Sequence, residues 1–281
     1  MRLPLRGAPL GLRRSLKAQR SAPAGSNDPA GVFVYDARAL IIAALRSAAT
    51  YLAVSVYVLF AAPIGMLLAM IFRWKGILYI FGHGGVRLGL ALCGITVRVA
   101  GAEHIPLDRA AVYCANHQSN VDPPILFDKL HPRMHIVYKA EINAIPLLAR
   151  AFRHGGFVPI ERRNKEAAMR SLEAGARSIR SGNSFLIFPE GTRSTTADLL
   201  PFKKGGFLMA LKAQAPIVPV AIQGGRDAMK RGSRVILPVR VSIRVGEPIE
   251  TSGMTMADRD ALIALVRARI EALLAEGPVV D

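Results

Sequence analysis

The sequence is poor in residues that support several familiar classes of protein. Only two cysteines, Cys93 and Cys114, occur among 281 residues, and neither has the C-x-x-C or Cys/His spacing that holds zinc. We therefore expect neither a disulfide framework nor a metal site. Aromatic residues make up 6% of the chain, which is sparse for the stacking surfaces that bind single-stranded nucleic acid. The G-x-S-x-G motif of a serine nucleophile elbow is missing as well.

Acidic residues are also scarce. The chain has 20 Asp and Glu against 37 Lys and Arg, a formal net charge of +17 and a pI near 10.7. Such a balance favours anionic partners, namely nucleic acid, acidic lipid surfaces or phosphorylated ligands. Since 51% of the residues are hydrophobic and the mean hydropathy is +0.29, a membrane surface is the leading candidate, ahead of nucleic acid.

No charged residue lies between Ser47 and Phe72. This run exceeds the ~20 apolar residues that cross a bilayer, although Pro63 and Gly65 interrupt it. The run predicts either a helical hairpin or kinked pair in one leaflet, or a single span with the preceding tail outside. A buried core helix is the weaker alternative. Basic residues flank both ends and so define no orientation: Arg38, Arg46, Arg73 and Lys75.

The chain divides into three expected segments. Residues 1–31 have the composition of a disordered basic tail, with an organelle transit peptide as the alternative. Residues 32–95 are expected to form a membrane-associating helical segment, whose last part is a packed or interfacial helix. Residues 96–281 alternate strand and helix patterns, which predicts an α/β layer sandwich. The expected strands are 96–101, 110–116, 156–161, 184–188, 216–223 and 238–249, and the expected helices are 122–130, 164–183, 205–214 and 256–277.

His117 follows a predicted buried strand, and Asp122 comes five positions later. A histidine at the end of a strand can take a proton from a hydroxyl, and a carboxylate at its Nδ1 can hold the ring and stabilise the imidazolium. Because no nucleophile motif accompanies the pair, the proton belongs to a substrate hydroxyl. Alternatively, His117 is an ordinary loop histidine and Asp122 is a helix N-cap with Pro123 at the first helical position. No other histidine has an evident acidic partner.

The stretch FPEGTRS, Phe188 to Ser194, follows another predicted strand. Gly191 permits a tight turn, and Glu190, Thr192 and Arg193 place polar groups at the strand end. The planar fork of Arg193 matches phosphate oxygens. The alternative is an ordinary turn with an ion pair between Glu190 and Arg193.

These motifs occur together with Arg162 in VPIER and with the apolar strand PIVPVAI. In order and spacing, the four blocks resemble those of the 1-acyl-sn-glycerol-3-phosphate acyltransferases, over roughly residues 95–250. Two departures affect the second block, where Glu161 stands in place of the common aspartate and Pro159 is inserted in the strand. Taken alone, Arg162 could be a solvated surface residue.

The resemblance implies an α/β fold with a mixed sheet flanked by helices, and acyl transfer from an acyl-CoA or acyl-carrier-protein thioester to the sn-2 hydroxyl of lysophosphatidic acid. His117 would be the base and Asp122 its orienting partner, without an acyl-enzyme, cofactor or metal. Arg162 and Arg193 would hold the acceptor phosphate. Glu190, Gly191 and Thr192 would shape that site, Gly191 through its backbone N–H.

Location and substrate follow from the same resemblance. The catalytic domain is expected at the cytoplasmic face of a membrane, the inner membrane if the source is bacterial, because the acceptor is a lipid and the donors are cytosolic. A related hypothesis keeps the chemistry but changes the acceptor to a lyso-ornithine lipid or another lysophospholipid. A basic membrane or nucleic-acid binder without enzymatic activity is a remote alternative that leaves the His117 and Arg193 motifs unexplained.

Overall fold

The computed structural model describes residues 25–27, 33–35, 37–74, 76–139, 144, 146, 149–150, 157–160, 165–196 and 198–280. The chain forms two compact units, residues 1–45 and 46–281, and the division between them lies within the long helix α2 (Ala37–Ile71). In the first unit, β1 (Gly25–Asn27) pairs antiparallel with β2 (Phe33–Tyr35). Most of the expected disordered tail, residues 1–24 and 28–31, lies outside the described residues.

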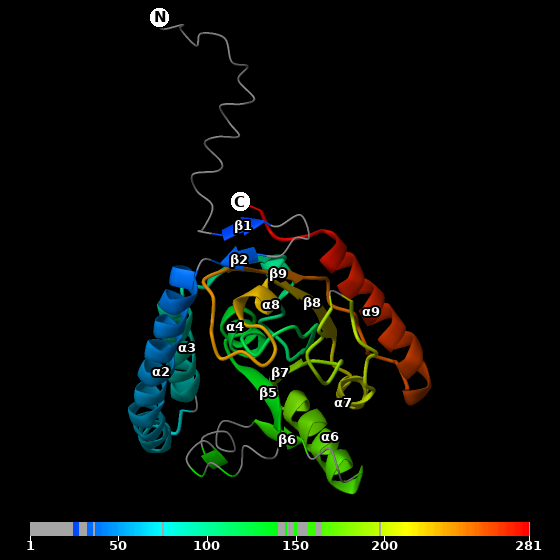
Figure 1. Cartoon of the computed structure of the whole chain (residues 1–281). Helices are drawn as coiled ribbons and strands as arrows, with labels where there is room; N and C mark the ends of the chain where they lie inside the picture. Colours follow the sequence, from blue (N-terminus) through cyan, green and yellow to red (C-terminus); the bar gives the residue numbers. More distant parts are fainter. Residues whose placement is uncertain are drawn as a thin grey trace, which may run out of the picture. The chain divides into compact units, whose positions relative to one another are not determined.

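A seven-stranded sheet organises the second unit, in the order β3-β9-β8-β4-β7-β5-β6 (Figure 1). Neighbouring strands run parallel except β8 and β9, which are antiparallel. The expected mixed sheet is thus confirmed. The strands are β3 (Thr96–Ala100), β4 (Val112–Ala115), β5 (Met134–Lys139), β6 (Val158–Ile160), β7 (Ser184–Ile187), β8 (Ile217–Gln223) and β9 (Arg240–Val245).

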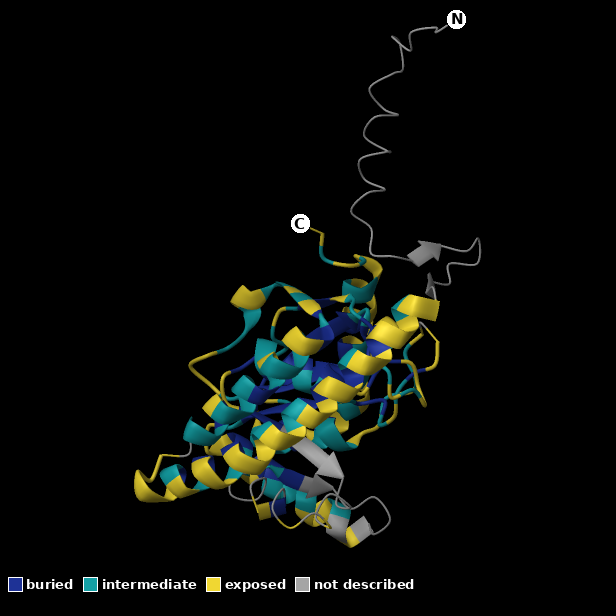
Figure 2. Ribbon diagram, turned by 60° about the vertical axis from the view of Figure 1, so that its left-hand side comes forward, coloured by how far each residue is buried: buried dark blue, intermediate teal, exposed yellow. Residues whose placement is uncertain are grey.

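Helices cover both faces of this sheet, as the strand-and-helix alternation predicts. One core cluster joins α3 (Gly76–Cys93) and α4 (Asp122–Lys129) to the sheet, and the other joins α6 (Lys165–Arg180), α7 (Gly205–Ala213) and α9 (Arg259–Ala275). Buried residues concentrate in the strands between these layers (Figure 2). Shorter elements are η1 (Ala102–His104), α8 (Gly225–Ala228) and η3 (Met256–Asp258).

The uncharged run forms one continuous helix and not a pair. Pro63 lies inside α2, and the chain turns only after Ile71, before α3 begins at Gly76. The expectation that Pro63 and Gly65 mark the turn of a hairpin is therefore wrong, since Pro63 is accommodated within the helix.

α2 and α3 pack antiparallel through small residues. Gly85 lies against the ring of Tyr57, and Gly89 lies against Val54, one turn earlier in α2. The Tyr57 hydroxyl donates to the Phe81 carbonyl over 2.9 Å. Close approach of two helix backbones requires such small side chains. The two helices are long and apolar enough to cross a membrane, and α2 is exposed along most of its length (Figure 2).

α3 also bonds to α4, through a buried carboxylate that the sequence reasoning did not anticipate. Asp128 Oδ1 accepts from Arg87 Nε over 2.9 Å and lies 3.1 Å from His83 Nδ1. The His83 ring stacks on Phe127, with centroids 4.6 Å apart. Burial alone would raise the pKa of Asp128, but hydrogen bonds from Lys129, Arg87 and His83 bring this pKa below its usual range. The expectation that no other histidine pairs with an acid is thus wrong for His83.

Two local predictions also fail. β5 was not predicted. In α6, the apolar spacing of the sequence places Met169, Leu172, Ala176 and Ile179 on one buried face, but Met169 is exposed whereas Ala176 and Ile179 are buried. The apolar stripe of this helix therefore starts later than the sequence pattern indicated.

Candidate active site

The two polar motifs meet at one edge of the sheet. His117 lies two residues beyond β4, and the FPEGTRS segment begins directly after β7, the parallel neighbour of β4. Carboxyl ends of parallel strands are the usual place for a site in such folds. Asn116 extends β4 by bonding to β8, because its side-chain amide donates to the Ile222 carbonyl over 3.0 Å and accepts from the Ile222 N–H over 2.7 Å.

His117 and Asp122 form the expected pair. Nδ1 of His117 lies 3.0 Å from Oδ2 of Asp122. The Asp122 side chain is fully buried, whereas the His117 side chain keeps 16% of its surface exposed. Because a carboxylate can only accept, the proton lies on Nδ1 and Nε2 is left with a free lone pair. The ring is further held by stacking on Phe188, with centroids 4.2 Å apart.

Asp122 does not act as a helix N-cap, contrary to one expectation. It is the first residue of α4, and Val121 occupies the capping position without a side-chain bond. Oδ2 of Asp122 instead accepts from the N–H groups of Gln118 and Ser119, over 2.6 and 2.7 Å. These bonds fold the loop back over the carboxylate, which is the conformation that brings His117 to it.

Glu190 ties the two motifs together through backbone groups. Its Oε1 accepts from the His117 N–H over 2.8 Å and its Oε2 accepts from the Leu200 N–H over 2.9 Å, and the side chain is buried. The Ser194 N–H in turn donates to the His117 carbonyl over 2.8 Å. Both Glu190 oxygens thus bond to backbone groups, and among the described residues Glu190 forms no ion pair with Arg193, in contrast to the alternative.

Gly191 occupies a position that requires glycine. Its φ of 69° is in the left-handed region, and a Cβ there would overlap the Lys203 side chain. The Gly191 N–H donates to the Phe188 carbonyl over 3.0 Å. The turn thus already uses this N–H, and its expected contact with the acceptor phosphate stays a prediction.

Arg193 is half-buried, Thr192 is exposed, and within the described part of the chain the Arg193 guanidinium makes no hydrogen bond or ion pair. Lys203 is exposed beside Gly191 and is equally unpaired among the described residues. Sequence reasoning overlooked Lys203, although a pair of lysines soon after the glycine turn was a usable signal. Arg162 lies outside the described residues.

Neither nucleophilic side chain beside the pair is available for covalent chemistry. Burial raises the pKa of the Cys114 thiol, helped by the nearby Glu190 charge, so Cys114 stays protonated. Ser119 is buried and donates its hydroxyl to the Met229 carbonyl over 2.9 Å. His117 is therefore placed to act on a hydroxyl that enters the site from outside.

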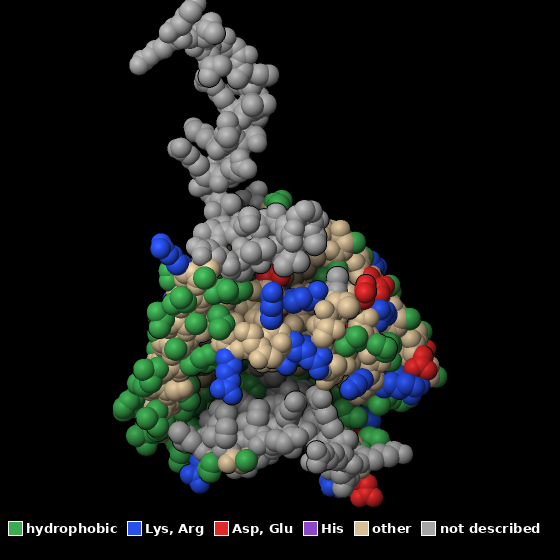
Figure 3. All heavy atoms as spheres, in the orientation of Figure 1, with side chains coloured by type: hydrophobic (Ala, Val, Ile, Leu, Met, Phe, Trp, Pro, Cys, Tyr) green, Lys and Arg blue, Asp and Glu red, His purple; other side chains and the backbone are tan. Residues whose placement is uncertain are grey.

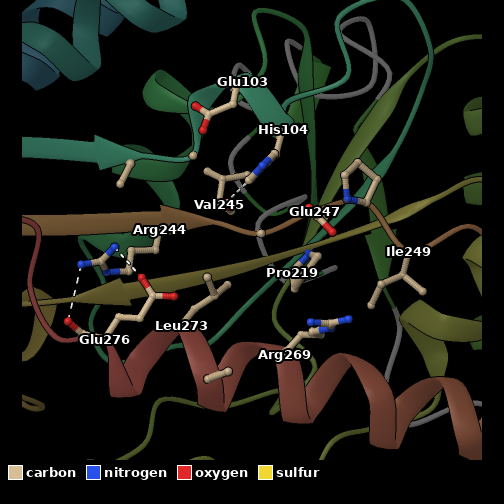
Figure 4. A pocket seen from close by; sticks show the side chains of 15 residues that line it. Glu103, His104, Pro219, Arg244, Val245, Glu247, Ile249, Arg269, Leu273 and Glu276 are labelled. Carbon is tan, nitrogen blue, oxygen red and sulfur yellow. Dashed lines mark hydrogen bonds and ion pairs between the residues drawn. The ribbon is translucent and has the colours of Figure 1, made fainter.

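A separate cavity of about 420 Å³ opens between η1, β9 and α9 (Figure 4). His104 points into it with Nδ1 on the Val245 carbonyl at 2.9 Å, and Arg244 is held by Glu276 at 2.7 Å. None of its lining residues belongs to the two motifs. Among the described residues, no group of three or more His, Cys, Asp or Glu is placed to hold a metal.

Comparison with known proteins places the chain in a class. A family model described as Acyltransferase matches residues 96–223, which include both motifs. The chain is 32% identical over 238 residues to the 1-acyl-sn-glycerol-3-phosphate acyltransferase of Cocos nucifera, covering 82% of this chain and 74% of that protein. It is 29% identical over 261 residues to the enzyme of the same name from Limnanthes douglasii, covering 90% and 88%.

The fold agrees. The crystal structure of the 1-acyl-sn-glycerophosphate acyltransferase PlsC from Thermotoga maritima superposes with a TM-score of 0.73, covering 85% of this chain and 98% of that one at 24% identity. The chain belongs to the 1-acyl-sn-glycerol-3-phosphate acyltransferase family, and it is an O-acyltransferase.

Proposed function

We propose that this enzyme transfers a fatty acyl group from an acyl-CoA or acyl-carrier-protein thioester to the sn-2 hydroxyl of 1-acyl-sn-glycerol-3-phosphate, giving phosphatidic acid. The observation that carries the proposal is the 3.0 Å contact between His117 Nδ1 and the buried Asp122 carboxylate, at the same sheet edge as the loop of Arg193, whose guanidinium has no partner among the described residues. The names of the relatives support the choice of acceptor.

The proposed reaction needs no covalent enzyme intermediate. Nε2 of His117 takes the proton of the sn-2 hydroxyl as the hydroxyl oxygen attacks the thioester carbonyl. Asp122 stabilises the imidazolium that forms. The C–S bond then breaks, and the imidazolium returns its proton to the leaving thiolate. The N–H groups of His117, Gln118 and Ser119 already bond to carboxylates, so the donor that stabilises the oxyanion lies elsewhere.

The acceptor phosphate binds on the β7 side of His117. Arg193 supplies the planar fork and Lys203 adds a point charge beside Gly191. Glu190 contributes indirectly, by fixing the loop that carries Arg193. Arg162 and Thr192 remain proposed members of this site.

The α2–α3 pair anchors the enzyme in one leaflet, with the catalytic domain on the cytoplasmic face. The inner side of α3 belongs to the protein core, because Tyr79 and Cys93 are buried and Val86 and Leu90 pack against the same cluster. Because α3 packs into the core of its domain, α3 does not cross a bilayer independently of that domain. The outer side of α2 is apolar and exposed (Figure 3), and its large residues include Leu52, Leu59, Phe60, Leu67 and Met70.

Product analysis by mass spectrometry tests the proposed acceptor. The purified enzyme is incubated with an acyl-CoA and, in separate reactions, with lysophosphatidic acid, a lyso-ornithine lipid, a lysophospholipid or a monoacylglycerol. We expect diacylated product mainly from lysophosphatidic acid. A clear preference for any of the other acceptors would contradict the proposal, and comparing acyl-CoA with acyl-carrier protein identifies the donor.

A further inference from the structure

Arg226 lies on the opposite side of the catalytic strand from Arg193. β4 is flanked by β7 and by β8, and Arg226 belongs to α8, which follows the carboxyl end of β8. The neighbouring Gly225 lies directly against Asp122, because a Cβ on Gly225 would overlap Oδ1 of that carboxylate and approach Ser119 Cβ to 3.4 Å. The segment that bears Arg226 is thus part of the wall around the His117–Asp122 pair.

The Arg226 guanidinium has buried donor atoms without a hydrogen-bond acceptor among the described residues. Its Nε and Nη2 are buried, and neither has a partner among the described residues. Other arginines of the domain contrast with it, since Arg244 pairs with Glu276 and Arg267 pairs with Glu271. A guanidinium stays charged at all relevant pH values, and buried charged donors in proteins nearly always have an acceptor.

Part of the side chain nevertheless reaches the surface, although Nε and Nη2 themselves are closed to solvent. Arg226 as a residue is only half-buried, whereas Gly225 and Ala228 on either side of it are buried. The adjacent acid Asp227 is exposed and forms no ion pair with it within the described chain. An oxyanion that reaches this place would satisfy the planar fork of donors, as carboxylates and phosphates do elsewhere.

We infer that Arg226 binds a phosphate of the acyl donor. This inference rests on the proposed function, in which the acceptor phosphate occupies Arg193 on the β7 side. A direct transfer brings two phosphorylated substrates to one base, and Arg226 offers the second anion a site on the β8 side of β4. Acyl-CoA and acyl-carrier protein both carry a phosphate on the pantetheine arm that ends in the thioester, so both donors meet this requirement.

Steady-state kinetics of Arg226→Gln test the inference, with Arg231→Gln as control. Arg231 lies in the following segment, is exposed and loses the same charge. With lysophosphatidic acid at saturation, the KM for acyl-CoA should rise by about 10–150-fold in Arg226→Gln. The KM for lysophosphatidic acid should not change, nor should the rate with an acyl N-acetylcysteamine thioester, which has no phosphate. Arg231→Gln should resemble the wild type throughout.

Thermal unfolding separates binding from a merely structural role. Without ligand, Arg226→Gln should keep or raise the Tm, because it removes a buried charge that has no partner. Free CoA should raise the Tm of the wild type and of Arg231→Gln but not that of Arg226→Gln. If Arg226→Gln does not fold, Arg226→Lys takes its place, since lysine keeps the charge without the fork and should still raise the KM for acyl-CoA.

Three results would overturn the inference: an unchanged KM for acyl-CoA, an equal loss with the phosphate-free thioester, or a rise in the KM for lysophosphatidic acid instead. A wild-type enzyme that acylates no lysophosphatidic acid from any of these donors would contradict the proposed function itself. The two failures are therefore distinguishable.

Discussion

At the scale of single residues, the position of one proton decides the chemistry of the site. The Asp122 carboxylate holds the proton of His117 on Nδ1, which leaves the Nε2 lone pair for the role of base in the proposed mechanism. We predict that His117→Ala lowers kcat by at least the ~10²–10⁴-fold that general acid–base catalysis contributes, with little change in acceptor binding. Thiol release from acyl-CoA measures the rate.

Asp122→Asn provides the matched variant. The amide keeps the size of the side chain but can place an N–H opposite Nδ1, which would favour the wrong tautomer. Much of the activity should be lost in either orientation of the amide: an NH2 group at the Oδ2 position would also oppose the Gln118 and Ser119 N–H groups, and an oxygen there would lack the charge that stabilises the imidazolium. If His117→Ala kept more than about a tenth of the wild-type rate, well outside the general acid–base range, His117 would not be the base.

Arg193 is predicted to discriminate acceptors by their phosphate. Arg193→Lys should weaken the capture of lysophosphatidic acid by about 10–150-fold, because one charge-assisted hydrogen bond contributes about 1.5–3 kcal/mol and lysine lacks the planar fork. The kcat/KM values for lysophosphatidic acid and for a monoacylglycerol are compared in both enzymes. An equal loss with the neutral acceptor would assign Arg193 a different role.

The sequence motif was sufficient to place His117 beside Asp122 and to bring the Arg193 loop to the same edge. It did not reveal the backbone bonds that make this arrangement rigid. Glu190 was assigned to the phosphate site, yet its oxygens bind N–H groups of His117 and Leu200. Such long-range bonds depend on how two loops meet, and no local spacing encodes them.

At the scale of elements, the buried Asp128 couples α3 to α4, the helix that begins with Asp122. We predict that Asp128→Asn lowers the free energy of unfolding by about 1.5–3 kcal/mol, the range for hydrogen bonds to a charged group. Denaturant unfolding in detergent measures the loss. Arg109→Gln, which removes an exposed ion pair with Glu250, is the control and should cost less.

The pH dependence of stability follows from the lowered pKa of Asp128. A carboxyl whose pKa is lowered by folding stabilises the protein above its unfolded value of about 3.9, and this contribution is lost as the pH falls through the lower folded value. Below about pH 4, the wild type should therefore lose the stabilising contribution of the Asp128 carboxylate to the free energy of unfolding. Asp128→Asn lacks this contribution at every pH, so the difference between the two proteins should shrink as the pH falls. If the curves of unfolding free energy against pH ran parallel for the two proteins, the pH dependence would not come from Asp128.

The alternation of strands and helices predicted most elements of the second unit, because buried strands and amphipathic helices have distinct periods. β5 was missed because His135 and Lys139 interrupt its apolar pattern. The turn between α2 and α3 was misplaced because proline was taken as a breaker. A proline inside a long apolar helix is tolerated where neighbouring elements hold the helix.

At the scale of the whole molecule, the exposed side of α2 is predicted to decide whether the enzyme reaches its lipid substrate. Leu59→Glu combined with Leu67→Glu should reduce binding to anionic vesicles and activity on bilayer-embedded lysophosphatidic acid, because charges are costly in the apolar part of a membrane. Activity on a soluble short-chain acceptor should persist. Leu265→Glu, on the exposed side of α9, is the control. Full vesicle binding by the double variant would contradict the anchor.

The cavity beside η1 and α9 has a practical consequence for the search for inhibitors. It measures about 420 Å³, and its lining includes neither His117 nor Arg193. A fragment bound against His104 and Arg269 would compete with neither substrate under the proposed mechanism. A screen that scores binding alone would thus select compounds that occupy the protein and leave turnover intact. Screens for this enzyme should be read out by thiol release.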